Sequence, residues 1–479
     1  MDYLKIHKDD NVHVALRDGL AVPAGHKQAI CDIRKGENVI KYGFPIGHAI
    51  KDIKMGEHVH THNVKTNLSD ILKYEYTPNY RELIKREPDT FMGYVRKDSS
   101  VGIRNEVWVI NTVFCVNGVA QKLCDMAKKE LLHKYPNVEG VHTFAHPYGC
   151  SQMGQDQLNT QLSLKGLVEH PNAGAVLVLG LGCENNRIDV FKEILGSWDE
   201  DRVKFLEAQS VEDEYEAGLE LLDQLMAYAN GFTRERVFAD KLKIGLKCGG
   251  SDGFSGITGN PLAGKACDIL VSQGGTAVLT EVPEMFGAER MLMDRCVSRE
   301  VFDKTVKLIN DFKQYFLDHG QVVYENPSPG NKDGGLTTLE DKSLGCTQKG
   351  GLSPVTDVIG YGEKAQKPGL TLLSAPGNDM VASTALTVAG CQIILFTTGR
   401  GTPMGAPVPT VKIATNTALF ERKNKWMDYD AGVIAKGLES DRAGEDFYKY
   451  IMAVASGRLT KNEEYDFREI GIFKNGVTL

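Results

Sequence analysis

The spacing of hydrophobic positions changes along the chain. Up to about residue 75, short apolar runs alternate with glycines, which predicts a small β domain without a long helix. From residue 93 onward, apolar runs such as 175–180 alternate with segments of helical spacing such as 211–229. Apolar strands that alternate with helices are typical of parallel sheets covered on both faces. We therefore predict an α/β fold that follows an N-terminal β domain.

These changes divide the chain into parts. Residues 1–75 are the β domain, and residues 76–92, with two prolines and six charges, are a linker. Residues 93–235 form a first α/β domain, and residues 236–479 form a second one with its own series of strands.

Three segments of the last domain carry local predictions. Ser298 suits the N-cap of the helix that follows it. Residues 380–399 are uncharged, but Gly390 and Gln392 interrupt them, so we predict a helix, a turn and a buried strand rather than a membrane span. Residues 326–351 are rich in Gly, Asn, Asp, Thr and Lys, which predicts a long loop.

Composition and charge disfavour several partners. The chain has 55 Lys and Arg against 63 Asp and Glu, a net charge of −8, which argues against nucleic acid and anionic membranes. The N-terminus lacks the apolar segment of a signal peptide, so we expect a cytoplasmic protein. Its ten cysteines form no C-x-x-C pair, and in a reducing compartment they are buried hydrophobic residues or metal-binding and catalytic thiols.

Polar residues after predicted strands are candidate ligands, because α/β sheets bind ligands beyond the carboxyl ends of their strands. Cys150, Cys183 and Cys248 each follow such a strand and stand beside glycine, and Glu281 directly follows another. Thiolates together with carboxylates suit Fe(II) or Zn(II). Their spacing matches no compact zinc motif, and cysteines are often buried without a further role, so both interpretations stay open.

Half of the 50 glycines lie within residues 243–420, where K-C-G-G-S-D-G-F-S-G-I-T-G-N-P (247–261) follows a predicted strand. This loop lacks the G-K-S/T of a Walker A motif. Its backbone N–H groups, with Ser251, Asp252 and Asn260, favour a small anionic or polyhydroxylated ligand over a plain turn. Arg400 could pair with a substrate carboxylate or form an ordinary salt bridge.

Histidines supply candidate acid–base groups. His58, His60 and His62 have the spacing of one strand face, where they could bind a metal or serve as general base, or be structural. His146 in H-P-Y-G-C-S-Q is a second acid–base candidate. Lys41, in V-I-K-Y-G of the same β domain, is a candidate substrate-binding residue.

Several motifs resemble one known family. V-I-K-Y-G-F-P-I-G-H-A-I (39–50), G-E-H-V-H-T-H-N (56–63) and T-N-L-S-D (66–70) are similar to the altronate branch of the altronate and galactarate dehydratases. H-P-Y-G-C-S-Q, G-L-G-C-E-N-N and G-R-G-T-P-M-G resemble the wider family, which includes sulfolactate sulfo-lyase. The match runs in order across nearly the whole chain.

The resemblance implies a β-clip (SAF-type) first domain, a middle domain that helps to form a homodimer, and a Rossmann-like C-terminal domain with a metal site. It implies dehydration of D-altronate to 2-dehydro-3-deoxy-D-gluconate in hexuronate catabolism, with Fe(II) or alternatively Mn(II).

A mechanism combines these expectations. The reaction removes the proton α to a carboxylate and expels the β-hydroxyl, so the developing negative charge must be stabilised. We hypothesise that some of Cys150, Cys183, Cys248 and Glu281 hold the metal. Arg400 would bind the carboxylate, the loop with Ser251 and Asp252 the hydroxyls, and His60, His62 or His146 would move protons.

Other functions remain open. Within the family these are galactarate dehydratase or a lyase of another 2-hydroxy acid. A nicotinamide-dependent dehydrogenase would need G-x-G-x-x-G after a strand, which residues 245–250 do not supply. A non-catalytic sugar-acid sensor is the alternative from another class.

Overall fold

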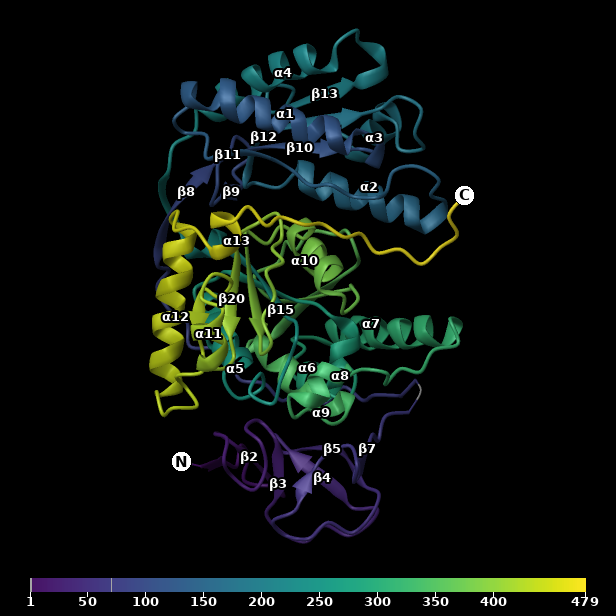
Figure 1. Cartoon of the computed structure of the whole chain (residues 1–479), viewed down its shortest axis with the longest axis vertical. Coiled ribbons are helices and arrows are strands. Elements are labelled where there is room, and N and C mark those ends of the chain that lie inside the picture. The colour runs from purple at the N-terminus through teal and green to yellow at the C-terminus, as the bar shows by residue number, and fades with distance from the viewer. Residues whose placement is uncertain (1, 70) are drawn as a thin grey trace.

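The computed structural model describes residues 2–69 and 71–479. Its three parts follow one another along the longest axis (Figure 1). The N-terminal strands lie at one end, the C-terminal sheet occupies the centre, and the middle domain lies at the other end. Within the described residues, no helix is long and apolar enough to cross a membrane.

The N-terminal domain consists of two small antiparallel sheets, with strand orders β1-β2-β3-β6 and β4-β5-β7. The apolar runs form strands as predicted, and two further strands, β5 and β7, join them. The bounds are β1 Tyr3–Leu4, β2 Val12–Ala15, β3 Lys27–Ala29, β4 Asn38–Lys41, β5 Phe44–Ala49, β6 His58–Val59 and β7 Val64–Lys65. The core of this domain also includes Ala288 and Leu344 of the C-terminal domain, so the two parts pack together.

The histidine segment corrects one prediction. Strand β6 ends at Val59, so His58, His60 and His62 do not share one strand face. The chain turns at His60 because the Asn63 side chain accepts a hydrogen bond from its backbone N–H at 2.9 Å. The Asn63 N–H in turn donates to the His60 carbonyl at 3.0 Å, which closes the turn.

The middle domain is a four-stranded parallel sheet with the order β11-β10-β12-β13. Val107 and Val109 face the helices α1 and α4, whereas Trp108 and Ile110 face α2 and α3. The strands are β10 Glu106–Asn111, β11 Gly140–Thr143, β12 Ala173–Gly180 and β13 Val203–Glu207. The helices are α1 Asn117–Glu130, α2 Gly154–Val168, α3 Ile188–Leu195 and α4 Glu214–Ala229.

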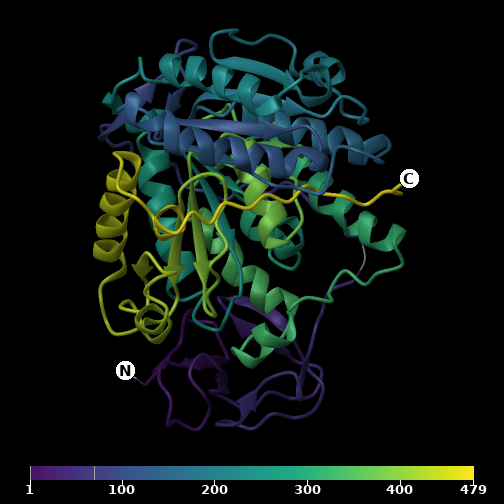
Figure 2. The ribbon, with the colours of Figure 1, turned by 45° about the horizontal axis from the view of Figure 1, so that its top comes forward.

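A small sheet marks where the chain enters and leaves the middle domain. It has the order β14-β8-β9 and contains β8 Thr90–Val95, β9 Val101–Gly102 and β14 Glu235–Phe238. The C-terminal segment then runs between the two α/β domains, as both views show (Figures 1 and 2). Backbone N–H groups of Asn475 and Gly476 donate to the Asp156 carboxylate of α2, each at 2.9 Å, which ties this segment to the middle domain.

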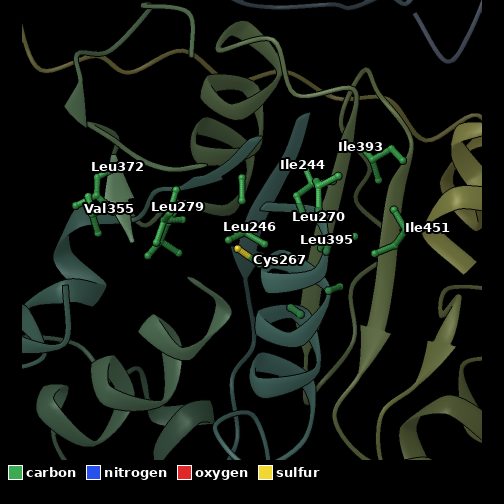
Figure 3. Packing of buried hydrophobic residues seen from close by; sticks show 14 of the residues in the cluster. Ile244, Leu246, Cys267, Leu270, Leu279, Val355, Leu372, Ile393, Leu395 and Ile451 are labelled. Carbon is green, nitrogen blue, oxygen red and sulfur yellow. The ribbon is translucent and has the colours of Figure 1, made fainter. Parts of the chain in front are cut away.

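The C-terminal sheet has seven strands, all paired in parallel, in the order β17-β18-β16-β15-β19-β20-β21. Apolar side chains of these strands pack against Cys267 and Leu270 of α5 and against Ile451 of α12 (Figure 3). The strands are β15 Lys243–Cys248, β16 Thr276–Leu279, β17 Val355–Ile359, β18 Gly369–Leu373, β19 Ile393–Thr398, β20 Thr410–Ala414 and β21 Tyr429–Asp430. The helices are α5 Gly259–Ser272, α6 Glu289–Met293, α7 Arg299–Asp318, α8 Pro329–Asp333, α9 Leu339–Cys346, α10 Asp379–Val388, α11 Thr417–Arg422, α12 Ser440–Ala455 and α13 Lys461–Glu464.

Two local predictions in this domain are confirmed and one is wrong. Ser298 caps α7 by accepting a hydrogen bond from the Val301 N–H, and residues 380–399 form α10, a turn and β19. Residues 326–351, expected to be a loop, instead contain α8 and α9. Their charged side chains, including Asp341 and Lys349, are buried in ion pairs, so polar composition did not mean solvent exposure here.

Candidate functional site

Thiols and carboxylates gather where strands of the C-terminal sheet end. Cys248 is the last residue of β15, Glu284 lies in the turn after β16, and Cys346 ends α9. One ligand atom from each of these three buried side chains lies within 4.8 Å of the others. Glu281, just after β16, adopts a left-handed backbone conformation with φ 68°, which is uncommon outside glycine. We call Cys248, Glu284 and Cys346 the thiol–carboxylate cluster.

Three buried lysines surround the thiol–carboxylate cluster. Lys247 pairs with Glu281 and, at 2.8 Å, with Asp379. Lys349 lies 3.0 Å from Glu281 and 2.7 Å from the Cys346 sulfur, while Lys342 donates to Glu284 at 2.8 Å. Buried charges are tolerated only when paired, so each ammonium here fixes the position of a carboxylate.

These neighbours shift the pKa values of the site. A hydrogen bond from Cys346 and the Lys349 charge lower the pKa of the Cys248 thiol to about 5. Burial raises the pKa of Cys346, so Cys248 is the first of the two thiols to ionise. Burial raises the pKa of Glu281 to about 7, whereas Lys342 and the other two lysines outweigh burial and lower that of Glu284 to about 2.

The donor set fits a borderline divalent cation. Two sulfurs and one carboxylate suit Fe(II) or Zn(II), and they suit the harder Mn(II) less well. The three ammonium groups cancel the carboxylates of Glu281, Glu284 and Asp379. Ionising both thiols would add two negative charges, which a divalent cation balances.

The glycine-rich loop after β15 places a hydroxyl beside the cluster. Ser251 Oγ lies 2.7 Å from the Cys248 sulfur. Asp252 accepts bonds from Ser255 and Thr415, each at 3.0 Å, and Asn260 donates to the Gly345 carbonyl at 3.0 Å, so both hold the loop in place.

Arg400 is exposed and follows β19, the strand next to β15. A side chain on Gly250 would meet Arg400 Cβ at 3.3 Å, so the arginine stem lies against the glycine-rich loop. A cavity of about 530 Å³ opens near Glu284 and is lined by Pro283, Asn326, Gly377 and Asn378, among others.

The N-terminal domain covers this edge of the sheet. Lys27 and Lys41, both buried, donate to the buried Asp341 of α9 at 2.8 and 3.0 Å. His26 and His60 contact the carbonyls of Asp333 and Lys332 at 3.2 and 2.9 Å.

The segment beneath these histidines reaches the cluster. Asn331 of α8 donates to the Ser251 carbonyl at 2.8 Å, and the Gly253 N–H donates to the Gly334 carbonyl at 2.7 Å. The histidines therefore lie one layer above the loop that carries Ser251.

The structure separates the residues predicted from sequence. Cys248, Ser251, Asp252, Asn260, Glu281 and Arg400 surround the same edge, with His60 and His62 on the domain that covers it. Lys41 binds Asp341 inside the interface between the two domains. Cys150, Cys183 and His146 belong to the middle domain instead.

His146 is fully engaged where it lies. It is buried, its Nε2 lies 2.9 Å from the Asn111 carbonyl, and its Nδ1 accepts from the Tyr148 N–H at 3.2 Å. Burial lowers the pKa of its imidazole, which stays neutral.

Sequence reasoning missed Cys346 and all three lysines of the site as functional residues. Cys346, Lys342 and Lys349 lie in the helical segment that was expected to be a loop, and no strand precedes them. A search for polar residues directly after predicted strands could not find these residues. Lys247 occupies the end of β15 itself, where a lysine looks like an ordinary exposed residue.

A buried set of paired ionisable groups at the carboxyl edge of a parallel sheet is typical of an enzyme active site. Family models identify which enzyme family it is. The D-galactarate/altronate dehydratase C-terminal domain matches residues 239–478, the second domain of the same enzymes matches 93–230, and their SAF domain matches 19–67. The chain therefore belongs to the altronate and galactarate dehydratase family and is a hydro-lyase.

Relatives match over nearly their full length. The chain is 55% identical to altronate dehydratase of Bacillus subtilis, with 100% of this chain and 99% of the relative covered. It is 53% identical to altronate dehydratase of Escherichia coli, with both chains fully covered. Identity to galactarate dehydratase (L-threo-forming) of Escherichia coli is 34%, over 95% of this chain and 93% of the relative.

Proposed function

We propose that this protein is a metal-dependent dehydratase that converts D-altronate to 2-dehydro-3-deoxy-D-gluconate and water, in hexuronate catabolism. The observation that carries the proposal is the thiol–carboxylate cluster, whose three donors lie within 4.8 Å of one another. The two relatives above 50% identity, both altronate dehydratases, support the choice of substrate.

The difficult step is removal of the weakly acidic proton next to the carboxylate. The negative charge that develops on the carboxylate oxygens must be stabilised within a site that excludes water. Lys247, Lys342 and Lys349 are buried cations held in fixed positions by their carboxylate partners. They are fixed donors beside the cluster that do not need to move during the reaction, and their charge is balanced by the paired carboxylates.

Cys248, Glu284 and Cys346 would hold the metal, with Fe(II) favoured over Mn(II) because two of the three donors are sulfur. When bound, such an ion acts as a Lewis acid toward the substrate carboxylate. Glu281 was predicted to be a metal ligand, and we propose a different role for it. It accepts a hydrogen bond from the Cys248 N–H at 3.0 Å and pairs with two lysines, so it positions the cluster.

The substrate would lie between the glycine-rich loop and the N-terminal domain. Arg400 binds its carboxylate, and Ser251 and the backbone N–H groups of the loop bind its hydroxyls. His62 would donate a proton to the leaving hydroxyl, which then departs as water. His62 is exposed, whereas His60 is already engaged with the Lys332 carbonyl.

Anaerobic turnover assays test this function. We expect Fe(II)-loaded protein to release a 2-keto-3-deoxy product from D-altronate at least 100-fold more efficiently than from galactarate. Cys346→Ser should lose turnover and bound iron together. Cys31→Ser, at an exposed thiol of the N-terminal domain, is the matched control and should keep both. Full turnover by metal-free protein, or preference for galactarate, would contradict the proposal.

A further inference from the structure

Three further cysteines converge at the carboxyl edge of the middle-domain sheet. Cys115 follows β10, Cys150 follows β11 and Cys183 follows β12. These three strands are neighbours and run parallel, so their carboxyl ends meet at one edge. Strands of the middle sheet run across the view in Figure 1, whereas β15 and β20 run down it. The two edges therefore open in different directions.

Hydrogen bonds hold the three cysteine loops together. The Phe114 N–H donates to the Tyr148 carbonyl at 2.9 Å, which joins the first two loops. The Asn186 N–H donates to the Gly149 carbonyl at 3.1 Å, and Ser151 N–H donates to the Asn185 side chain at 2.8 Å, which joins the second loop to the third. Partial burial and the charges of the two other thiols raise the pKa of Cys115, as expected of sulfurs within electrostatic range.

Glycine is required where the first two loops touch. Gly149 has φ 97°, and a Cβ there would overlap the Thr112 carbonyl oxygen. The close approach brings the loop of Cys150 onto the loop of Cys115.

The three thiols and the Glu207 carboxylate, which ends β13 beside Gly182, are the open donors found at this edge in the described residues. Glu184 is buried and accepts bonds from Thr112 and from two backbone N–H groups, and His146 uses both ring nitrogens. Cys115 and Cys183 are exposed and Cys150 is half-buried, so all three sulfurs are accessible. In the described residues they do not form a group tight enough for a single ion, since the thiol–carboxylate cluster is the one such group found.

Helix N-termini also lie at this edge. Helices α1, α2 and α3 begin within a few residues of Cys115, Cys150 and Cys183, respectively. None of the three has a side-chain N-cap. The Asn117 N–H of α1 donates to the Phe114 carbonyl, so the N-termini open to an anion are those of α2 and α3, whose helix dipoles would add to the attraction.

We propose that Cys115, Cys150 and Cys183 bind a cubane iron–sulfur cluster through three thiolates. In a cubane each thiolate binds a different iron, so the thiolate sulfurs lie farther apart than around a single ion. Three thiolates leave the fourth iron open to water or a small ligand. The three thiols lose their protons on binding, and the resulting anionic cluster faces the free helix N-termini. The site is separate from the thiol–carboxylate cluster and does not depend on the proposed function.

Reconstitution of the full-length protein with iron and sulfide under anaerobic conditions tests the proposal. We expect about four acid-labile sulfides per chain and about four irons beyond any held by the thiol–carboxylate cluster, with the broad visible absorption of an iron–sulfur cluster. Cys183→Ser and the triple serine variant should lose the sulfide and the absorption. Cys346→Ser and Cys31→Ser should keep both, which separates this site from the other one.

A second measurement covers variants that fail to fold. Mass spectrometry of the unmodified protein after alkylation should show Cys115 and Cys183 protected by reconstitution, and Cys31 labelled throughout. Iron without labile sulfide, or cluster absorption that survives in the triple variant, would each overturn the proposal.

Discussion

The chain contains two parallel sheets whose carboxyl edges carry cysteines beside glycine, and their chemistry differs. At the C-terminal sheet, Cys248 and Cys346 are buried among three lysines and their carboxylate partners. At the middle sheet, Cys115 and Cys183 are exposed and lie near the N-termini of uncapped helices. The same local sequence pattern therefore produces a charged, water-excluded site in one place and an exposed edge near helix N-termini in the other.

The difference arises from what packs over each edge. The N-terminal domain and the α8–α9 segment cover the C-terminal edge, through Lys27, Lys41 and Asp341. Covered thiols lose contact with water, so they need fixed counter-charges. At the middle edge, Cys115 and Cys183 are exposed, so water can solvate them without fixed counter-charges.

The largest expected effect tests whether catalysis takes place at the carboxyl edge of the C-terminal sheet. Glu284→Gln removes a metal donor and leaves Lys342 buried without its partner. We expect kcat/KM to fall about 10³-fold, the scale of losing a main transition-state contact, together with the bound iron. Steady-state kinetics and metal analysis measure both.

A matched variant in the middle domain controls for the loss of a buried ion pair. Glu106→Gln breaks the buried pair with Arg468, which has a distance of 2.9 Å. We expect it to lower stability while kcat/KM changes less than about 3-fold, under 1 kcal/mol of transition-state energy. Equal losses in the two variants would show that the effect of Glu284→Gln is structural.

The next variant removes the covering domain's anchor. Asp341→Asn leaves Lys27 and Lys41 buried without a negative partner, which costs about 3 kcal/mol in comparable cases. We expect easier unfolding in urea, faster proteolysis within the 71–89 segment, and lower turnover.

Asp32→Asn, in the exposed pair with Lys54, should change stability far less. If the two variants were equally stable, the N-terminal domain would be held by apolar packing on Leu344 and Ala288 rather than by ions.

Much of the architecture could be predicted from the sequence because the spacing of apolar residues reflects which side chains are buried. The parallel sheets, the Ser298 cap and the division of residues 380–399 all follow from local patterns, and the structure confirms them. The α8–α9 segment could not be predicted in this way. Its lysines and acids find partners in distant parts of the chain, such as Lys27 with Asp341, and composition alone does not reveal such pairs.

The site was predicted only in part for a related reason. Cys248, Ser251 and Arg400 follow strands, so the rule about carboxyl edges found them. The same rule assigned Cys150 and Cys183 to one metal with Cys248, although the predicted domain division already placed them on a different sheet. Cys346 follows no strand at all, and only the packing of α9 brings it to Glu284.

A smaller effect concerns pH at the covering domain. Burial, followed by the neighbouring imidazoles, lowers the pKa of His58 to about 4, and burial also lowers the pKa of His26 and His60. These groups stay neutral when folded but gain protons near pH 6.5 when unfolded. The stability of the folded protein should therefore fall as pH drops from about 6.5 toward 4, with no change from these groups above 6.5.

Urea midpoints measured across this pH range test the histidine effect. His58→Asn should flatten the dependence. His133→Asn, which changes a histidine of the middle domain, should leave the pH dependence of stability unchanged. A wild-type protein whose stability stays constant between pH 6.5 and 4.5 would contradict the expectation.

The smallest expected effect probes the uncapped helices of the middle edge. Met153 is the N-cap residue of α2, has an extended backbone (φ −134°, ψ 155°) and is 49% exposed, so a serine there can cap the helix. Met153→Ser should raise the stability of cluster-free protein by about 1 kcal/mol. Ser298→Ala, which removes the existing cap of α7, should lower the stability by a similar amount. The hydroxyl added by Met153→Ser occupies N–H groups that would otherwise face a bound anion, so this variant should also retain the reconstituted iron–sulfur cluster less well. Thermal unfolding and labile-sulfide content measure the two effects, and a gain in stability without loss of cluster would show that the free N-termini do not take part in binding.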